Sequence, residues 1–187
     1  MARLRKFVAY RSLKRAYTRF SKYKTKNFVR MRPVCKVVRF DMGEQRADYQ
    51  HRLALLPATE TGFQIRDNAI ESARQSANRV LESALGKTGY FFRTKIYPHH
   101  IMRENPLASG AGADRMSTGM AHNYGKPMGV AAQVKPGKPV FEVFVNKENI
   151  SLAKKALKRA SYKIPNHCLI VEEELSRTAQ PALQAKA

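Results

Sequence analysis

The chain is poor in cysteine and has no long apolar run. Its two cysteines, Cys35 and Cys168, lie far apart and form no Cys-x-x-Cys pair, so the sequence excludes a disulfide framework and favours a reducing compartment. No apolar stretch approaches 18 residues, and Phe7 to Tyr10 is too short and too interrupted by charge for a signal-peptide core. We therefore expect a soluble, intracellular protein with no membrane partner.

Acidic residues are also scarce. The 187 residues include 14 Asp and Glu against 35 Lys and Arg, for a net charge of +21. A net charge of this size is informative about binding partners and not about the fold, and it favours nucleic acid as the partner. Residues 1–40 contain 14 basic residues and no acidic one, so only +7 remains for the rest of the chain. This imbalance predicts a basic arm joined to a milder domain.

The predicted arm covers residues 1–32 and alternates cations with aromatic residues. Cations neutralise phosphates while aromatic rings stack on unpaired bases or riboses, a mixture that suits RNA more than duplex DNA. The alternative is a solvated tail whose aromatics pack on the domain, but so dense a block of like charges repels itself without a polyanion. The predicted RNA-binding cations of the arm are Arg3, Arg5, Lys6, Arg11, Lys14, Arg15, Arg19, Lys22, Lys24, Lys26, Arg30 and Arg32. The aromatics between them are Phe7, Tyr10, Tyr17, Phe20, Tyr23 and Phe28.

Residues 33–175 are long enough for one compact domain. Short runs rich in β-branched and aromatic residues predict strands at Val34–Phe40, His51–Leu56, Tyr90–Tyr97, Val130–Lys135, Val140–Val145 and Cys168–Val171. The order strand, strand, helix, strand therefore occurs twice, which predicts an α+β sandwich. The last residues, 176–187, are rich in Ala and Gln and are predicted to be a disordered tail.

Two helices are predicted between these strands. The first begins at a capping box of Asn68 and Glu71 and stops at Gly86. Its apolar face comprises Ile70, Ala73, Ala77, Val80, Leu81 and Ala84. The second follows Asn146 as its cap, and its apolar face comprises Ile150, Ala153, Leu157 and Ala160. Its outer cations either extend the basic surface or form a soluble face; they are Lys154, Lys155, Lys158 and Arg159.

Further RNA-binding residues are predicted at and after the strand at 90–97. Arg93 and Lys95 alternate with Phe92 and Ile96, so one sheet face presents charge while the other enters the core. Phe91 and Tyr97 share the charged face, where they either stack on RNA or cover a second hydrophobic layer. The set is completed by three residues that follow, His99, His100 and Lys126.

A glycine-rich segment, residues 108–128, separates two predicted strands. Loops longer than about 12 to 15 residues without structure of their own are usually functional or disordered. This one has almost no large aliphatic residues and carries Arg115 and Lys126 against a single acid, Asp114. We predict a protruding loop that reaches into a polyanion.

The sequence matches none of the catalytic or metal-binding patterns that we considered. In Gly119 to Lys126, five residues separate Gly119 from Gly125 where a phosphate-binding loop has four, and Pro127 stands where it has Ser or Thr. The spacing of the five histidines and two cysteines matches no structural zinc pattern. No nucleophile, base and orienting partner can be assembled. We expect no enzyme, no metal and no cofactor.

Several segments resemble one family of proteins. They are Tyr97-Pro-His-His-Ile-Met-Arg-Glu-Asn, Ala111-Gly-Ala-Asp-Arg-Met, Thr118-Gly-Met, Tyr124-Gly-Lys-Pro-Met-Gly, Val38-Arg-Phe-Asp-Met-Gly, Glu71-Ser-Ala-Arg-Gln-Ser-Ala-Asn-Arg and Ala160-Ser-Tyr-Lys-Ile-Pro. Together they are similar to the large-subunit ribosomal proteins called L-ten-e in archaea and eukaryotes and L-sixteen in bacteria. The resemblance covers roughly residues 10 to 172 and is strongest to the archaeal branch.

This resemblance implies an α/β-hammerhead-type sandwich and a structural role in cytoplasmic ribosomes. The partners that it implies are large-subunit (23S-type) rRNA, nearby 5S rRNA, A-site and P-site tRNA, and neighbouring ribosomal proteins. The long loop would face tRNA near the peptidyl-transferase centre, with Arg115 and His122 as its main candidates for RNA or tRNA contact. The tRNA-facing set is Ser109, Gly110, Gly112, Asp114, Arg115, Met116, Gly119 and His122. The alternative function is that of a free nucleic-acid chaperone or chromatin protein, for which the basic arm alone would suffice.

Overall fold

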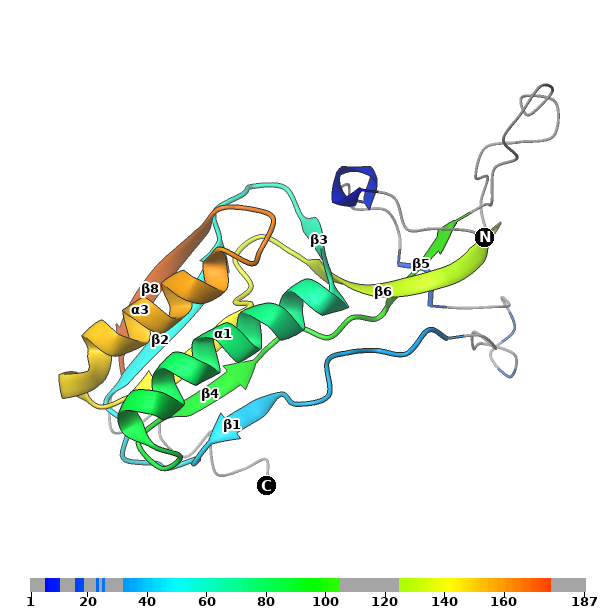
Figure 1. Ribbon diagram of the computed structural model, residues 1–187. Coiled ribbons are helices and arrows are strands. Elements are labelled where there is room, and N and C mark those ends of the chain that lie inside the picture. Colours follow the sequence, from blue (N-terminus) through cyan, green and yellow to red (C-terminus); the bar gives the residue numbers. More distant parts are fainter. Residues whose placement is uncertain are drawn as a thin grey trace, which may run out of the picture.

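The chain forms two antiparallel sheets and two long helices. A computed structural model describes residues 6–10, 16–18, 23, 25, 32–104 and 125–175. The larger sheet has five strands in the order β1-β4-β7-β2-β8, and the smaller has three in the order β3-β6-β5. Helices α1 and α3 lie side by side over one face of the larger sheet, while β5 and β6 extend beyond them (Figure 1). The α+β prediction is confirmed.

The strands are short and their bounds are as follows. The larger sheet contains β1 (Asp41–Gly43), β4 (Phe91–Thr94), β7 (Phe141–Val145), β2 (His51–Pro57) and β8 (Cys168–Glu174). The smaller sheet contains β3 (Phe63–Arg66), β6 (Lys126–Val134) and β5 (His100–Glu104). The helices are α1 (Asp67–Leu85) and α3 (Ile150–Ser161), with short 3-10 turns η1 (Phe7–Tyr10) and η3 (Lys147–Asn149).

The main core lies between the helices and the larger sheet. Helix α3 buries Ala153, Ala156, Leu157 and Ala160, and the small alanines allow it to approach α1 closely. Along the strands the side chains alternate, so Phe141, Val143 and Val145 of β7 enter this core. Phe92 and Ile96 are buried as predicted. Phe91 is buried too, in a smaller cluster on the face of the sheet away from the helices, here called the outer face; the cluster is Tyr49, Phe91 and Phe144.

The helix predictions are correct in position and wrong at their starts. Gly86 ends α1 with a φ of 67°, a conformation that glycine adopts without strain. The Asn68–Glu71 capping box is wrong, because α1 begins at Asp67 after Arg66 and has no side-chain capping bond. Ala84 is exposed and does not belong to the buried face. Asn146 likewise precedes η3 without a capping bond, and α3 begins only at Ile150.

The strand predictions are wrong in several places. Strand β6 begins at Lys126, within the predicted loop 108–128, and not at Val130. Residues 34–40 form no strand; they lie beside the first turn of α1, where the Lys36 amide donates to the Asp67 carboxylate at 3.1 Å. The predicted strand at 90–97 ends at Thr94, and a separate strand, β5, begins after Pro98. Strands β1 and β3 were not predicted. The two strand-strand-helix-strand units are therefore not equivalent, since β3, β5 and β6 form a sheet of their own.

Candidate nucleic-acid interface

Part of the basic arm docks on the smaller sheet through Tyr10. The Tyr10 hydroxyl donates to the carboxylate of Glu104, which ends β5. The Tyr10 carbonyl accepts a hydrogen bond from the side-chain amide of Gln64 in β3 at 2.9 Å. Glu104 and Gln64 are both buried polar side chains, and a buried polar group must be hydrogen-bonded to avoid a desolvation cost. Tyr10 therefore anchors the arm across β3 and β5.

A second anchor is Tyr17, which lies against the beginning of β5. Its amide donates to Nδ1 of His100 at 2.8 Å, and its carbonyl accepts from the Ile101 amide at 3.1 Å. The guanidinium of Arg103 lies 3.8 Å from the centre of the Tyr17 ring. Because His100 accepts at Nδ1, its ring is neutral; burial and then the charge of Arg103 lower its pKa. For Tyr10 and Tyr17 the structure favours the packing alternative over stacking on RNA.

A cation and aromatic rings gather where β4 leads into β5. The Tyr97 ring lies 5.7 Å from that of Phe40 and 4.6 Å from that of His99. The guanidinium of Arg32 lies 5.5 Å from the Tyr97 ring centre and donates to the Tyr97 hydroxyl at 3.2 Å and to the Pro98 carbonyl at 3.3 Å. We call Arg32, Phe40, Tyr97 and His99 the aromatic cluster. Three of its members, Arg32, Tyr97 and His99, are exposed, so its cation and rings are open to a phosphate or a base.

The predicted cations Arg93 and Lys95 have acidic partners on the outer face. Arg93 pairs with Asp41 at 2.9 Å, and Lys95 approaches Glu142 at 3.4 Å. Arg52 also binds Glu142, at 2.5 Å, and pairs with Glu173. The Glu142 side chain is only 3% exposed, and two cations neutralise it. The charge of this face is thus largely matched within the protein, and RNA binding by Arg93 and Lys95 stays a prediction.

Lys6 and Lys126 are exposed at the surface, as the prediction requires. Lys126 opens β6 directly opposite Glu104 at the end of β5, so the chain leaves β5 and enters β6 at the same end of the smaller sheet. The other arm cations lie outside the described residues; they are Arg3, Arg5, Arg11, Lys14, Arg15, Arg19, Lys22, Lys24, Lys26 and Arg30. The residues predicted to face tRNA lie outside them too, namely Ser109, Gly110, Gly112, Asp114, Arg115, Met116, Gly119 and His122.

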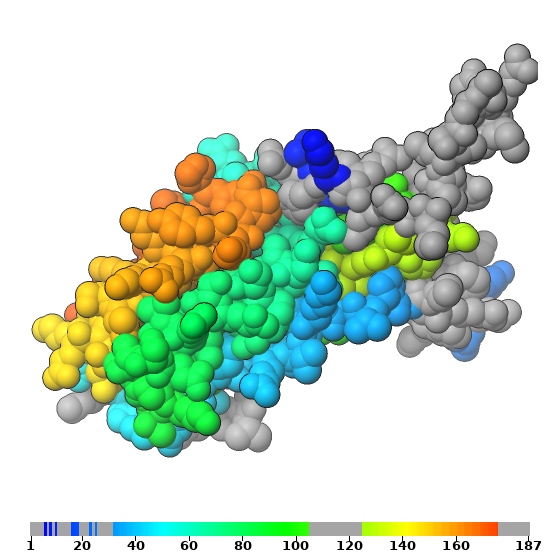
Figure 2. Space-filling model, viewed as in Figure 1, coloured from blue at the N-terminus to red at the C-terminus, as the bar shows by residue number. Residues whose placement is uncertain are grey.

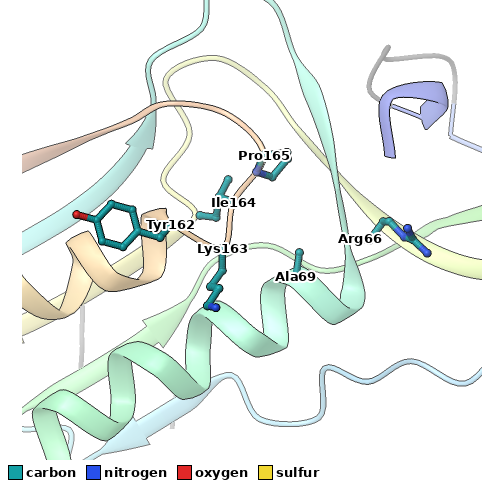
Figure 3. A pocket seen from close by; sticks show the side chains of 6 residues that line it. All are labelled: Arg66, Ala69, Tyr162, Lys163, Ile164 and Pro165. Carbon is teal, nitrogen blue, oxygen red and sulfur yellow. The ribbon is translucent and has the colours of Figure 1, made fainter. Parts of the chain in front are cut away.

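A hollow of about 300 Å³ lies between the start of α1 and the end of α3. Its lining is Arg66, Ala69, Tyr162, Lys163, Ile164 and Pro165, all labelled in Figure 3. Figure 2 shows α3 (orange) and α1 (green) side by side on the face where this hollow opens. The sequence prediction did not include Arg66, Tyr162 or Lys163. The signal that could have revealed this surface is Tyr162 followed by Lys163, an aromatic and a basic residue directly after α3.

Other kinds of site find no support in the described part of the chain. No group of three His, Cys, Asp or Glu side chains is placed to hold a metal ion there. Burial raises the pKa of the Cys168 thiol to about 11, which makes it a poor nucleophile at neutral pH. Among the described helices, none has the length and apolarity needed to cross a membrane.

Comparison with known proteins identifies the family. Residues 14–171 match the family model of ribosomal protein L16p/L10e. Proteins named large ribosomal subunit protein uL16 are 44% identical in Staphylothermus marinus over 169 residues (89% of this chain and 96% of the relative) and 43% identical in Methanococcus maripaludis over 169 residues (90% and 93%). The Archaeoglobus fulgidus protein of that name is 42% identical over 165 residues (88% and 90%). These matches show a structural ribosomal protein, which works in cytoplasmic ribosomes and is not an enzyme: the chain belongs to the L16p/L10e family, in its archaeal branch.

Proposed function

We propose that the protein binds large-subunit rRNA through the residues gathered around β5 and helps to position tRNA near the peptidyl-transferase centre. The observation that carries the proposal is a convergence on this one strand. The arm docks on β5 through Tyr10 and Tyr17, and the aromatic cluster lies at its beginning. The glycine-rich segment leaves from its end, at Glu104. The most basic part of the chain and its longest polar segment therefore emerge from one small sheet.

Each part has a distinct role in this proposal. Residues 1–32 are the arm that neutralises rRNA phosphates, residues 33–175 are an α/β-hammerhead-type domain, and residues 176–187 are a tail. In the aromatic cluster, Arg32 binds a phosphate and the rings receive a base or ribose. The predicted loop, now shortened to the part of residues 108–128 that precedes β6, faces A-site and P-site tRNA. The surrounding partners are 23S-type rRNA, 5S rRNA and neighbouring ribosomal proteins.

The rRNA part is tested by binding across a salt series. The full chain and a variant lacking residues 1–32 are titrated with a 23S-type rRNA transcript and with a shuffled RNA of equal length. We expect the full chain to prefer the rRNA, and the deletion to lower the log-log salt slope by roughly 0.7 to 0.9 for each phosphate that the arm had neutralised. Equal affinity for both RNAs would contradict specific rRNA binding, and an unchanged slope would contradict the arm's role.

The tRNA part is tested on assembled subunits. Arg115→Ala removes the one arginine of the loop, and Arg46→Ala serves as the control because Arg46 is an exposed arginine paired with Glu44 at 2.7 Å. We expect both variants to enter large subunits. Subunits with Arg115→Ala should bind A-site tRNA more weakly and form dipeptides more slowly, because a hydrogen bond to a charged group contributes about 1.5 to 3 kcal/mol. Normal tRNA binding with failed incorporation would make the loop a structural anchor instead.

A further inference from the structure

One face of α3 carries a row of exposed cations that ends in an exposed tyrosine. Lys155, Lys158, Arg159 and Tyr162 are spaced by three, four and seven residues from the first, so they follow one side of the helix into the turn that ends it. All four are exposed, and Tyr162 is 71% exposed. We call these four residues the α3 row.

The cations of the row lack acidic partners among the described residues. The neighbouring Lys154 does pair with an acid, Glu172 of β8, at 2.7 Å, whereas Lys155, Lys158 and Arg159 form no ion pair there. Like charges three or four residues apart on a helix destabilise it. A solvated helix face normally mixes both signs, and this one does not. The arrangement is suited to an external polyanion, whose phosphates would remove the repulsion.

The row leads directly to the hollow at the end of α3. Lys163 extends from the rim of the hollow toward α1 (Figure 3). The apolar lining of the hollow is formed by Ala69, Ile164 and Pro165. Arg66 stands at the far side, with its guanidinium directed away from Tyr162. Neither the Arg66 guanidinium nor the Lys163 ammonium group has a hydrogen bond or ion pair with a described residue. The volume of about 300 Å³ is at the lower end of the range for small-molecule sites, which suits one planar base.

We infer that the α3 row and this hollow form a second RNA-binding surface, separate from β5, in which the cations follow the phosphates of one strand and Tyr162 stacks on an unpaired base. The inference rests on the proposed rRNA binding and adds a site to it. An acidic protein surface would neutralise the cations but would give the Tyr162 ring no stacking partner. RNA satisfies both the cations and the exposed Tyr162 ring, which points away from the apolar lining of the hollow (Figure 3), since sequence-tolerant stacking on aromatic side chains accompanies phosphate contacts in single-strand recognition.

The charge part is tested with full-length protein and a 23S-type rRNA transcript across a salt series. The variant is Lys155→Gln, Lys158→Gln and Arg159→Gln together. The control is Lys87→Gln, Lys135→Gln and Lys138→Gln, which removes the same charge from exposed residues elsewhere. Glutamine forms helices well, so both variants should stay folded. We expect the α3 variant to lower the log-log slope by about two and the affinity at least tenfold relative to the control.

The stacking part uses two substitutions of Tyr162. Tyr162→Leu should weaken binding between about fivefold and about 150-fold, the range for stacking of one base on an aromatic side chain. Tyr162→Phe keeps the ring and should bind like wild type. Equal losses for Leu and Phe, or no loss for Leu, would overturn the stacking assignment.

The outcomes separate this inference from the proposed function. If the wild type binds the rRNA transcript no more tightly than a shuffled RNA, the proposed function fails. If the wild type binds rRNA specifically while the α3 variant matches its control, only the α3 surface fails. If the α3 variant binds rRNA normally but is excluded from large subunits, the row contacts a ribosomal protein, which also overturns the inference.

Discussion

The two faces of the five-stranded sheet carry their cations differently. On the outer face Arg52, Arg93 and Lys95 each meet an acid, including the buried Glu142. On the helix-covered side, Lys155 and Lys158 meet none among the described residues. With 14 acids for 35 cations, the acids are too few to match every cation one to one. The acids lie where partly buried cations need them, and this leaves the exposed side of α3 open to a polyanion.

The largest effect on this comparison should come from Glu142→Gln. The substitution keeps the shape of the side chain and removes the charge that neutralises Arg52 and Lys95. Breaking a buried pair leaves an unmatched charge, but Arg52 is partly exposed and keeps Glu173, so we expect a loss of about 1 to 3 kcal/mol. Thermal unfolding and denaturant titration measure it. A loss below about 0.5 kcal/mol would mean that the outer-face pairs do not stabilise the fold.

A smaller effect should follow acidification, through His100. Burial and then Arg103 lower its pKa below the ordinary 6.5, so the undocked ring takes a proton first as pH falls. Docking of Tyr17 is therefore complete above about pH 6.5 and is lost as pH falls through the lowered pKa, because protonated Nδ1 no longer accepts the Tyr17 amide. The loss is about 0.5 to 1.5 kcal/mol, the net value of one hydrogen bond.

Hydrogen exchange of the Tyr17 amide at several pH values, corrected for the intrinsic exchange rate, measures this effect. The control is the Gly86 amide at the end of α1, which donates to a backbone carbonyl of its own helix. Protection of Tyr17 should decline on acidification while that of Gly86 does not. Parallel behaviour of both amides would contradict a role for His100.

Glu173→Gln should have a still smaller effect. Glu173 pairs with Arg52 on the outer face, but its side chain is 50% exposed. Exposed ion pairs contribute about 0.2 to 1 kcal/mol, and salt screens them. We expect a loss in this range at low salt that shrinks at high salt, measured by denaturant titration. A loss as large as that of Glu142→Gln would show that burial does not set the strength of these pairs.

The smallest effect on stability should come from Lys155→Gln. The residue is exposed and has like-charged neighbours at positions 158 and 159, so removing its charge relieves repulsion. We expect the free energy of unfolding to change by no more than about 0.5 kcal/mol, and relief of the repulsion should make this change a gain. Denaturant titration decides, and a loss above about 1 kcal/mol would reveal an internal partner for Lys155.

Elements with a strong local period were predicted well. The buried faces of α1 and α3 repeat every three or four residues, and β2 and β7 are β-rich runs bounded by turn residues. Strands β3 and β5 were missed because they are short and owe their existence to pairing with β6. Residues 34–40 look like a strand in isolation, but Lys36 bonds to the first turn of α1, and in this segment only Phe40 bonds to a described strand through its backbone, at Thr94 of β4.

The candidate interface likewise has features that the sequence predicts and features that depend on the fold. Composition alone determined the net charge of +21, because net charge is a sum over residues and does not depend on the fold. Only the tertiary structure decided which cations are matched. Arg93 meets Asp41 from 52 positions away, Tyr17 meets His100 from 83, and Tyr162 and Arg66 line opposite sides of one hollow. Ion pairs and stacking act over a few ångströms in space, and such distances between remote residues are set by the packing of strands and helices.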